Sequence, residues 1–160
     1  MRITIANHQK LARVNKALLR PLVAALADNA QKTGIQCPWR ELTIILVDDT
    51  IMPQINQSIL RHQGTTDVIT QRYAVMPGEP AGLIGEIYVN IEQALRKYPR
   101  RQGWSPQHEV ALYIAHGCDH LNDESDADNA GRRRMRQREL RWLRSFENNH
   151  PRVLQNFVTT

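Results

Sequence analysis

The sequence has little cysteine and no long hydrophobic run. Its 160 residues include two cysteines, too few for the disulfide framework of a small secreted domain. No apolar stretch approaches the roughly 20 residues that a membrane-spanning helix needs. The first residues also lack the apolar core of a signal peptide. We therefore expect a cytoplasmic protein that has no membrane as a partner.

Aromatic residues are also scarce, at 6% of the chain, and nothing in the sequence resembles a base-stacking platform that binds single strands. Internal repeats and low-complexity blocks are lacking too. A hydrophobic content of 41% and a charged content of 23% are ordinary for a globular protein, and this length suffices to bury one core. We predict a single domain over residues 1–150 and a loosely held tail over 151–160.

The charge is positive, with a formal net value of +5 and a pI near 9.6. This favours a polyanionic partner, nucleic acid first, although a merely basic enzyme explains the total equally well. Acidic residues gather between 119 and 128, and arginines follow between 132 and 144. The arginines are too many for one helix face, so solvated side chains and phosphate contacts both remain open.

The hydrophobic pattern predicts an α/β fold, with four strands and five to six helices in one domain. Alternating or β-branched runs indicate strands over residues 2–7, 42–47, 68–73 and 83–89. Apolar residues at helical spacing indicate helices over 10–32, from 48 or 49 to about 60–62, over 90–101, from Ser105-Pro106 onward and over 127–147. We expect a mostly mixed four-stranded sheet.

His116 and His120 are the strongest candidate functional residues. They lie four residues apart at the end of an apolar helix, so both imidazoles can converge on one ion. Asp126 follows at loop distance, and three protein ligands with one open position are typical of a catalytic zinc site. We predict one zinc ion per chain, with Fe2+ or Ni2+ as alternatives. Two structural histidines at a helix end are the alternative to a metal site.

Two residues beside the histidines narrow the range of reactions that the predicted metal site could catalyse. The zinc peptidase motif has glutamate directly after the first histidine, and Gly117 at that position argues against a peptidase. Asp119 lies about 60° from His116 around the helix. It is therefore a candidate catalytic residue that contacts an imidazole or a bound water. A solvated acid at a helix end is the alternative for this residue.

The motif His116-Gly-x-x-His120, with a third ligand at Asp126, resembles the YbeY family of metal-dependent endoribonucleases, which are rRNA maturation factors. The resemblance extends through most of the chain. Its further segments are Ile55-Asn56, Thr66-Asp67-Val68-Ile69 and Gly85-Glu86-Ile87, together with Glu109 and Met135.

The chain departs from the family pattern at several positions. The third ligand of the family is usually histidine and is Asp126 here, which is still a zinc ligand by type. The family arginine that supports RNA cleavage falls on Leu60. We expect the adjacent Arg61 to take the catalytic role, and the alternatives are that His62 substitutes or that activity is weakened. Asp119 replaces a leucine of the family.

The resemblance implies a zinc-dependent hydrolase, a single-strand endoribonuclease that acts in maturation of the 16S rRNA 3′ end and in ribosome quality control. RNA is the expected partner, and the ribosome or its small-subunit proteins are further candidates. Two alternatives remain. One is a non-catalytic ribosome-assembly factor with a structural metal, which the loss of the family arginine favours. The other is a metallohydrolase with a different substrate.

Overall fold

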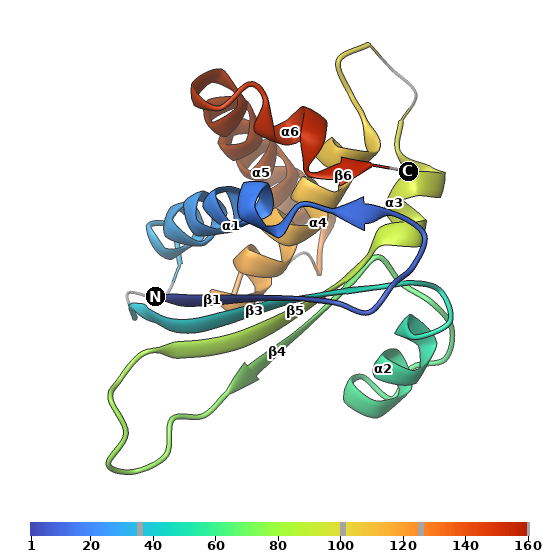
Figure 1. Cartoon of the computed structure of the whole chain (residues 1–160). Coiled ribbons are helices and arrows are strands. Elements are labelled where there is room, and N and C mark those ends of the chain that lie inside the picture. Colours follow the sequence, from blue (N-terminus) through green and yellow to red (C-terminus); the bar gives the residue numbers. More distant parts are fainter. Residues whose placement is uncertain (35–36, 100–101, 125–126, 160) are drawn as a thin grey trace.

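The computed structural model describes residues 1–34, 37–99, 102–124 and 127–159. The strands are β1 (Arg2–Asn7), β2 (Arg13–Val14), β3 (Trp39–Val47), β4 (Val68–Tyr73), β5 (Leu83–Asn90) and β6 (Val158–Thr159). The helices are α1 (Lys16–Gln31), α2 (Met52–Ile59), α3 (Ile91–Lys97), α4 (Pro106–Leu121), α5 (Asn129–Asn149) and α6 (Val153–Asn156). Over these ranges the predicted α/β class and helix number are confirmed (Figure 1).

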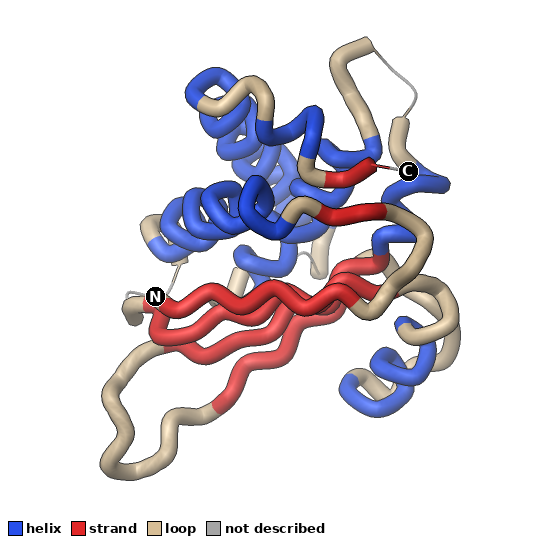
Figure 2. The backbone as a smooth tube through the Cα atoms, in the orientation of Figure 1, coloured by secondary structure: helices blue, strands red, loops and turns tan. Residues whose placement is uncertain are grey.

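A four-stranded mixed sheet forms the centre of the domain, as predicted. Its strand order is β1-β3-β5-β4. β3 runs parallel to both β1 and β5, whereas β4 is antiparallel to β5. Figure 2 shows most of the helices gathered over one face of this sheet. The carboxyl ends of β3 and β5 therefore lie at the same edge, where α2 and α3 begin.

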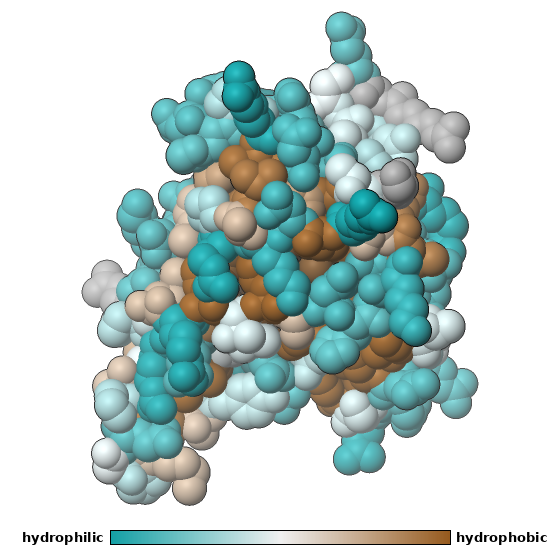
Figure 3. Space-filling model, viewed as in Figure 1, coloured by the Kyte–Doolittle hydropathy of each residue, from teal (hydrophilic) through white to brown (hydrophobic). Residues whose placement is uncertain are grey.

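Two hydrophobic clusters hold the layers together. The larger one packs the sheet against α1, α4, α5 and α6, and the smaller one packs α2 on the opposite face through Val47, Met52 and Ile69. On the side shown in Figure 3, hydrophilic residues cover most of the surface and hydrophobic residues show in the hollows between them. No helix among the described residues has the length and apolar character to cross a membrane.

The first helix begins later than predicted. Asn15 caps α1 by accepting hydrogen bonds from the backbone N–H groups of Ala17 and Leu18, and an asparagine in this role fixes a helix start. The two preceding residues form β2 and pair with β6. Pro21 is accommodated inside the helix.

The prediction that the segment after Pro151 is loosely held is wrong. Residues 153–156 form α6, and Val158 pairs with Val14 through β6 and β2. Leu154 and Phe157 are fully buried. These apolar side chains complete the main core, and their burial outweighs the entropy of ordering a short terminal segment. The packed domain therefore continues past residue 150.

Two glycines bring α4 unusually close to β5. A Cβ atom on Gly117 would lie 2.6 Å from Ile87 Cγ2, and one on Gly85 would lie 2.8 Å from Leu121 Cδ1. A larger residue at position 117 would push the helix away from the strand. The absence of the peptidase glutamate at this position therefore has a packing reason, and the contact fixes both histidines relative to the sheet.

A polar network fastens the segment that precedes β4. Asp49 Oδ1 accepts hydrogen bonds from Asn90 Nδ2 at 2.7 Å and from Thr65 Oγ1 at 2.7 Å. Asn90 Nδ2 also donates to the carbonyl oxygen of Thr66 at 3.0 Å. The network ties residues 65–66 to the carboxyl end of β5, and it thereby positions Asp67 at the start of β4.

Candidate metal centre

The two predicted histidine ligands meet at the end of α4. His116 Nε2 and His120 Nε2 lie 3.0 Å apart, and the two rings are nearly perpendicular, at 77°. The convergence follows from the four-residue spacing on a helix that Gly117 holds against β5. The structure thus brings together the first two ligands of the predicted site.

The other nitrogen of each ring contacts a hydrogen-bond acceptor. His116 Nδ1 lies 2.8 Å from Glu139 Oε1, and His120 Nδ1 lies 3.2 Å from the carbonyl oxygen of Glu124. Neither an ionised carboxylate nor a carbonyl can donate, so each Nδ1 carries the proton. In neutral rings the lone pairs of both Nε2 atoms then face one another.

Two facing lone pairs repel each other unless a cation lies between them. Zinc bonds of 2.0–2.1 Å in a tetrahedral arrangement separate two imidazole nitrogens by about 3.3 Å, close to the 3.0 Å observed between the Nε2 atoms. The side chain of Glu139 is 2% exposed, and a carboxylate behind a ligating histidine is a common support of a metal site. The residues present therefore fit a metal ion.

The third predicted ligand, Asp126, lies outside the described residues. Among the residues that are described, no group of three or more histidine, cysteine or acidic side chains is arranged to hold a metal ion. The three-ligand zinc site accordingly stays a prediction. The structure describes the positions of two of its predicted ligands, His116 and His120.

Asp119 lies on the same helix but contacts a different partner. Its side chain is fully buried, and Arg138 Nη2 lies 2.9 Å from Asp119 Oδ2. Burial raises the pKa of Asp119 to about 7, although the guanidinium of Arg138 opposes the shift. Arg138 also reaches Glu124 Oε2 at 3.2 Å. The side chain that contacts the Nδ1 atom of His116 is Glu139, and the catalytic role of Asp119 stays a prediction.

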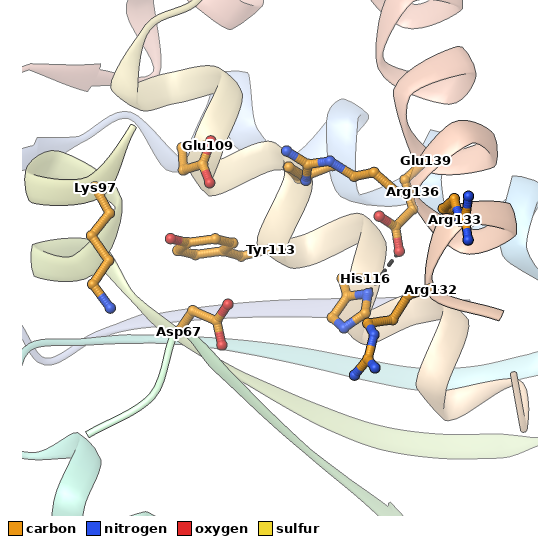
Figure 4. Close-up of a pocket in the computed structure, with 10 residues that line it drawn as sticks. Asp67, Lys97, Glu109, Tyr113, His116, Arg132, Arg133, Arg136 and Glu139 are labelled. Carbon is orange, nitrogen blue, oxygen red and sulfur yellow. Dashed lines mark hydrogen bonds and ion pairs between the residues drawn. The ribbon is translucent and has the colours of Figure 1, made fainter. Parts of the chain in front are cut away.

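A cavity of about 550 Å³ opens beside His116. Figure 4 shows Arg132 of α5 beside His116, the side chain of Arg136 extending from α5 toward Glu109, and Tyr113 of α4 between Glu109 and Asp67. We call this space the arginine cavity. Its lining residues are Asp67, Lys97, Glu109, Leu112, Tyr113, His116, Arg132, Arg133, Arg136 and Glu139.

A second cavity, of about 350 Å³, also borders the histidines and is called the β4 cavity. Its lining residues are Leu60, Asp67, Val68, Ile69, Thr70, His116 and His120. His116 and Asp67 line both cavities, so the two spaces adjoin at the histidine pair. His116 is therefore reached from both cavities and His120 from the β4 cavity.

The resemblance puts an arginine at the position of Leu60, and this position lies at the β4 cavity. Leu60, which ends α2, lines it and is 44% exposed. Arg61 is exposed, has a φ of 60°, and is not among the described residues that line either cavity. The catalytic role of Arg61 stays a prediction, and Leu60 marks where an arginine would enter the site.

Sequence reasoning missed the functional importance of Glu139 and Arg138. No sequence pattern singled out Glu139, yet it is the buried contact of His116. It is the single acidic residue between Asn129 and Phe146 in a helix that carries seven arginines. A single acidic residue among many arginines in one helix suggests that the acid has a specific partner. This was the feature of the sequence that could have pointed to Glu139.

Known proteins are similar to this chain over most of its length. The family model described as Endoribonuclease YbeY matches residues 4–147. The Endoribonuclease YbeY of Salinibacter ruber is 33% identical over 107 residues, which cover 64% of this chain and 68% of that protein. The Endoribonuclease YbeY of Syntrophotalea carbinolica is 28% identical over 146 residues, which cover 86% and 92%.

The fold has a solved counterpart. The solution structure of TM1509 from Thermotoga maritima superposes with a TM-score of 0.55 at 21% identity, covering 92% of this chain and 93% of that one. The family match spans nearly the whole domain, including both histidines and the residues that line the two cavities. This chain belongs to the endoribonuclease YbeY family.

Proposed function

We propose that this protein is a metal-dependent endoribonuclease that cleaves single-stranded rRNA, in maturation of the 16S 3′ end and in ribosome quality control. A zinc ion held by His116, His120 and Asp126 would provide Lewis-acid activation of water or of a phosphate oxygen. Such a role implies a cytoplasmic protein that meets the ribosome or its small-subunit proteins. Family membership supports the endoribonuclease part of the proposal.

The convergence of His116 Nε2 and His120 Nε2 beside the arginine cavity is the observation that carries the proposal. Glu139 contacts His116 through Nδ1, so Nε2, which faces His120, is the nitrogen that would bind a metal. Arg132, Arg133 and Arg136 are exposed at the rim and would neutralise a phosphodiester backbone. Together these groups provide metal ligands and phosphate contacts in one place.

The test combines metal analysis with RNA cleavage. We expect one metal ion per chain in the purified protein, and cleavage of single-stranded rRNA fragments that a chelator abolishes. His116→Ala should lose both the metal and the cleavage, whereas the matched change His8→Ala, at an exposed position outside both cavities, should keep both. A peptide or small phosphoester cleaved in place of RNA would identify a different metallohydrolase.

A non-catalytic ribosome-assembly factor is the second candidate. The specific observation in its favour is Leu60, which lines the β4 cavity at the place where the resemblance puts an arginine. A leucine there offers no charge to stabilise a phosphate that develops negative charge during cleavage. In this case the metal would hold the end of α4 in place, and the basic surface would dock on rRNA.

Leu60→Arg separates the two candidates. If the site is catalytic, a guanidinium in the β4 cavity should raise the cleavage rate by roughly 10-fold, because it adds a cation beside the reacting phosphate. The protein should stay folded, since Leu60 is 44% exposed. Leu11→Arg makes the same chemical change at a residue that is 50% exposed and outside both cavities, and should leave the rate unchanged. Absence of cleavage in the wild type and in Leu60→Arg would favour the assembly factor.

A further inference from the structure

The two histidines of the predicted metal site are supported in different ways. His116 Nδ1 contacts a buried side chain, Glu139 of α5. His120 Nδ1 instead lies 3.2 Å from a backbone oxygen, the carbonyl of Glu124 in the segment that follows α4. A backbone carbonyl is a usual partner for the second nitrogen of a ligating histidine. The orientation of His120 therefore depends on the groups that hold Glu124 in place.

The chain turns back over the end of α4 to bring Glu124 to His120. The backbone N–H of Asp123 donates to the carbonyl oxygen of His120 at 3.1 Å, and the backbone N–H of Glu124 donates to that of Asp119 at 3.2 Å. Both distances are at the long end of the usual range of about 2.7–3.2 Å. Asp123 also has a φ of 63°, a left-handed conformation that is uncommon outside glycine. The backbone alone therefore restrains this turn only modestly.

Arg138 of α5 joins the turn to the core. Its Nη2 atom lies 3.2 Å from Glu124 Oε2 and 2.9 Å from Asp119 Oδ2. The side chain of Asp119 is fully buried and that of Arg138 is 15% exposed, whereas that of Glu124 is 31% exposed. Because Asp119 already orders the guanidinium, the contact with Glu124 loses less side-chain entropy than an ion pair between two mobile groups.

Stability alone gives no reason for the buried pair of Asp119 and Arg138. Replacing a buried ion pair by apolar residues is often neutral or stabilising, and the resemblance puts a leucine at position 119. A leucine could not hold a guanidinium in this place. The pair is therefore a feature in which this chain departs from the family pattern, and it lies directly beside His120 in the sequence.

We propose that Arg138 is a positioning residue of the metal site. Through the side chain of Glu124, it keeps the carbonyl oxygen of that residue against His120 Nδ1, so that the proton stays on Nδ1 and Nε2 is directed at the metal. Asp119 anchors the guanidinium of Arg138. The inference rests on the proposed function, because it concerns the metal that His120 would bind.

A second ion pair in the same turn provides a matched control. Arg72 Nη1 of β4 lies 2.9 Å from Asp123 Oδ1, and these side chains are 42% and 59% exposed. An ion pair between two exposed side chains restrains its partners little. Asp123 and Glu124 are adjacent and carry the same charge, so they differ chiefly in which arginine they contact.

Zinc affinity, measured by competition with a chelator, tests the role of the Arg138 contact. Glu124→Met removes the carboxylate at similar side-chain length and leaves the backbone carbonyl in place. Zinc affinity should fall by about 5-fold, less than the 10–100-fold typical of groups that contact a ligand directly, because Arg138 acts through a second residue. Glu124→Gln retains an acceptor for Arg138 and should lose less. Asp123→Asn removes the same charge from the adjacent residue and should keep the wild-type affinity.

The tautomer of His120 in the metal-free protein provides a second measurement. Nitrogen-15 NMR distinguishes a protonated ring nitrogen from an unprotonated one. In the wild type the proton of His120 should be on Nδ1, and in Glu124→Met a fraction of it should move to Nε2, while His116 stays unchanged. A contact that only stabilised the fold would lower the free energy of unfolding in urea without changing this tautomer.

The outcomes separate this inference from the proposed function. Unchanged zinc affinity in Glu124→Met, or an unchanged tautomer of His120, overturns the positioning role. An equal loss of affinity in Asp123→Asn also overturns it, because general charge would then explain the effect. If the wild type binds zinc and cleaves RNA in these cases, the proposed function stands. Absence of zinc binding by the wild type would overturn both.

Discussion

The same two helices are joined by two histidine–glutamate pairs of very different character. His108 Nε2 lies 3.2 Å from Glu147 Oε1, and His116 Nδ1 lies 2.8 Å from Glu139 Oε1. The two histidines are eight residues apart on α4, and the two glutamates are eight residues apart on α5. Because the pairing order is reversed, the helices are antiparallel and each pair fastens one end of their contact.

The pairs differ in the group that the second ring nitrogen of each histidine faces. His108 uses Nδ1 at the start of α4, where the backbone N–H of Ser105 lies 3.2 Å away, so both of its nitrogens face protein partners. His116 binds Glu139 through Nδ1 and directs Nε2 toward His120. One pair belongs to the cap of α4, and the other lies beside the predicted metal site. The chemical type of the pair does not distinguish them, whereas the group that the second nitrogen of each histidine faces does.

The largest effect on stability should come from a third contact between these helices. Arg138→Ala leaves the carboxylate of Asp119 buried without its cation, and breaking a buried ion pair in this way costs about 3 kcal/mol. Asp119 is fully buried and lies 2.9 Å from Arg138. The free energy of unfolding, measured in urea, should fall by that amount.

A double substitution provides the control for this contact. In Asp119→Leu with Arg138→Leu both charges are removed together, so the free energy of unfolding should return to within about 1 kcal/mol of the wild type. If the double variant is as unstable as Arg138→Ala, the loss comes from the packing of Arg138 over Trp142 rather than from the unpaired acid.

The second largest effect is expected on metal affinity, and its size should differ between the two histidine–glutamate pairs. Glu139→Gln keeps an acceptor for His116 Nδ1 but loses the negative charge, and loss of such a supporting contact weakens metal binding by about 10-fold. Zinc affinity, measured by competition with a chelator, should be unchanged in Glu147→Gln. An equal loss in both variants would mean that helix packing, rather than the support of a ligand, explains the effect.

The sheet and the convergence of the two histidines were accessible to sequence reasoning because their signals are local. Strand β4 was predicted with the bounds that the structure has, since three consecutive β-branched residues follow a turn there. His116 and His120 followed from spacing along one helix. The Ser105-Pro106 start of α4 was likewise predicted from its two residues.

The remaining features depend on contacts between distant segments. The pairing of Glu139 with His116 links residues 23 apart, and its register cannot be derived from either helix alone. The closing segment was predicted to be loose because terminal residues are often poorly ordered, and β2 and β6, each only two residues long, give no strand pattern in the sequence. Their pairing across most of the chain length becomes evident only when Phe157 is seen in the core.

The smallest effect should be that of Glu147→Gln on stability. Glu147 is 35% exposed, and glutamine can still accept a hydrogen bond from His108 Nε2, so we expect the free energy of unfolding to fall by less than 1 kcal/mol. Urea unfolding of Glu147→Gln beside Glu139→Gln measures the difference. If Glu147→Gln were the more destabilising change, the pair at His108 would be the principal structural link between α4 and α5, because exposure would then not have weakened it.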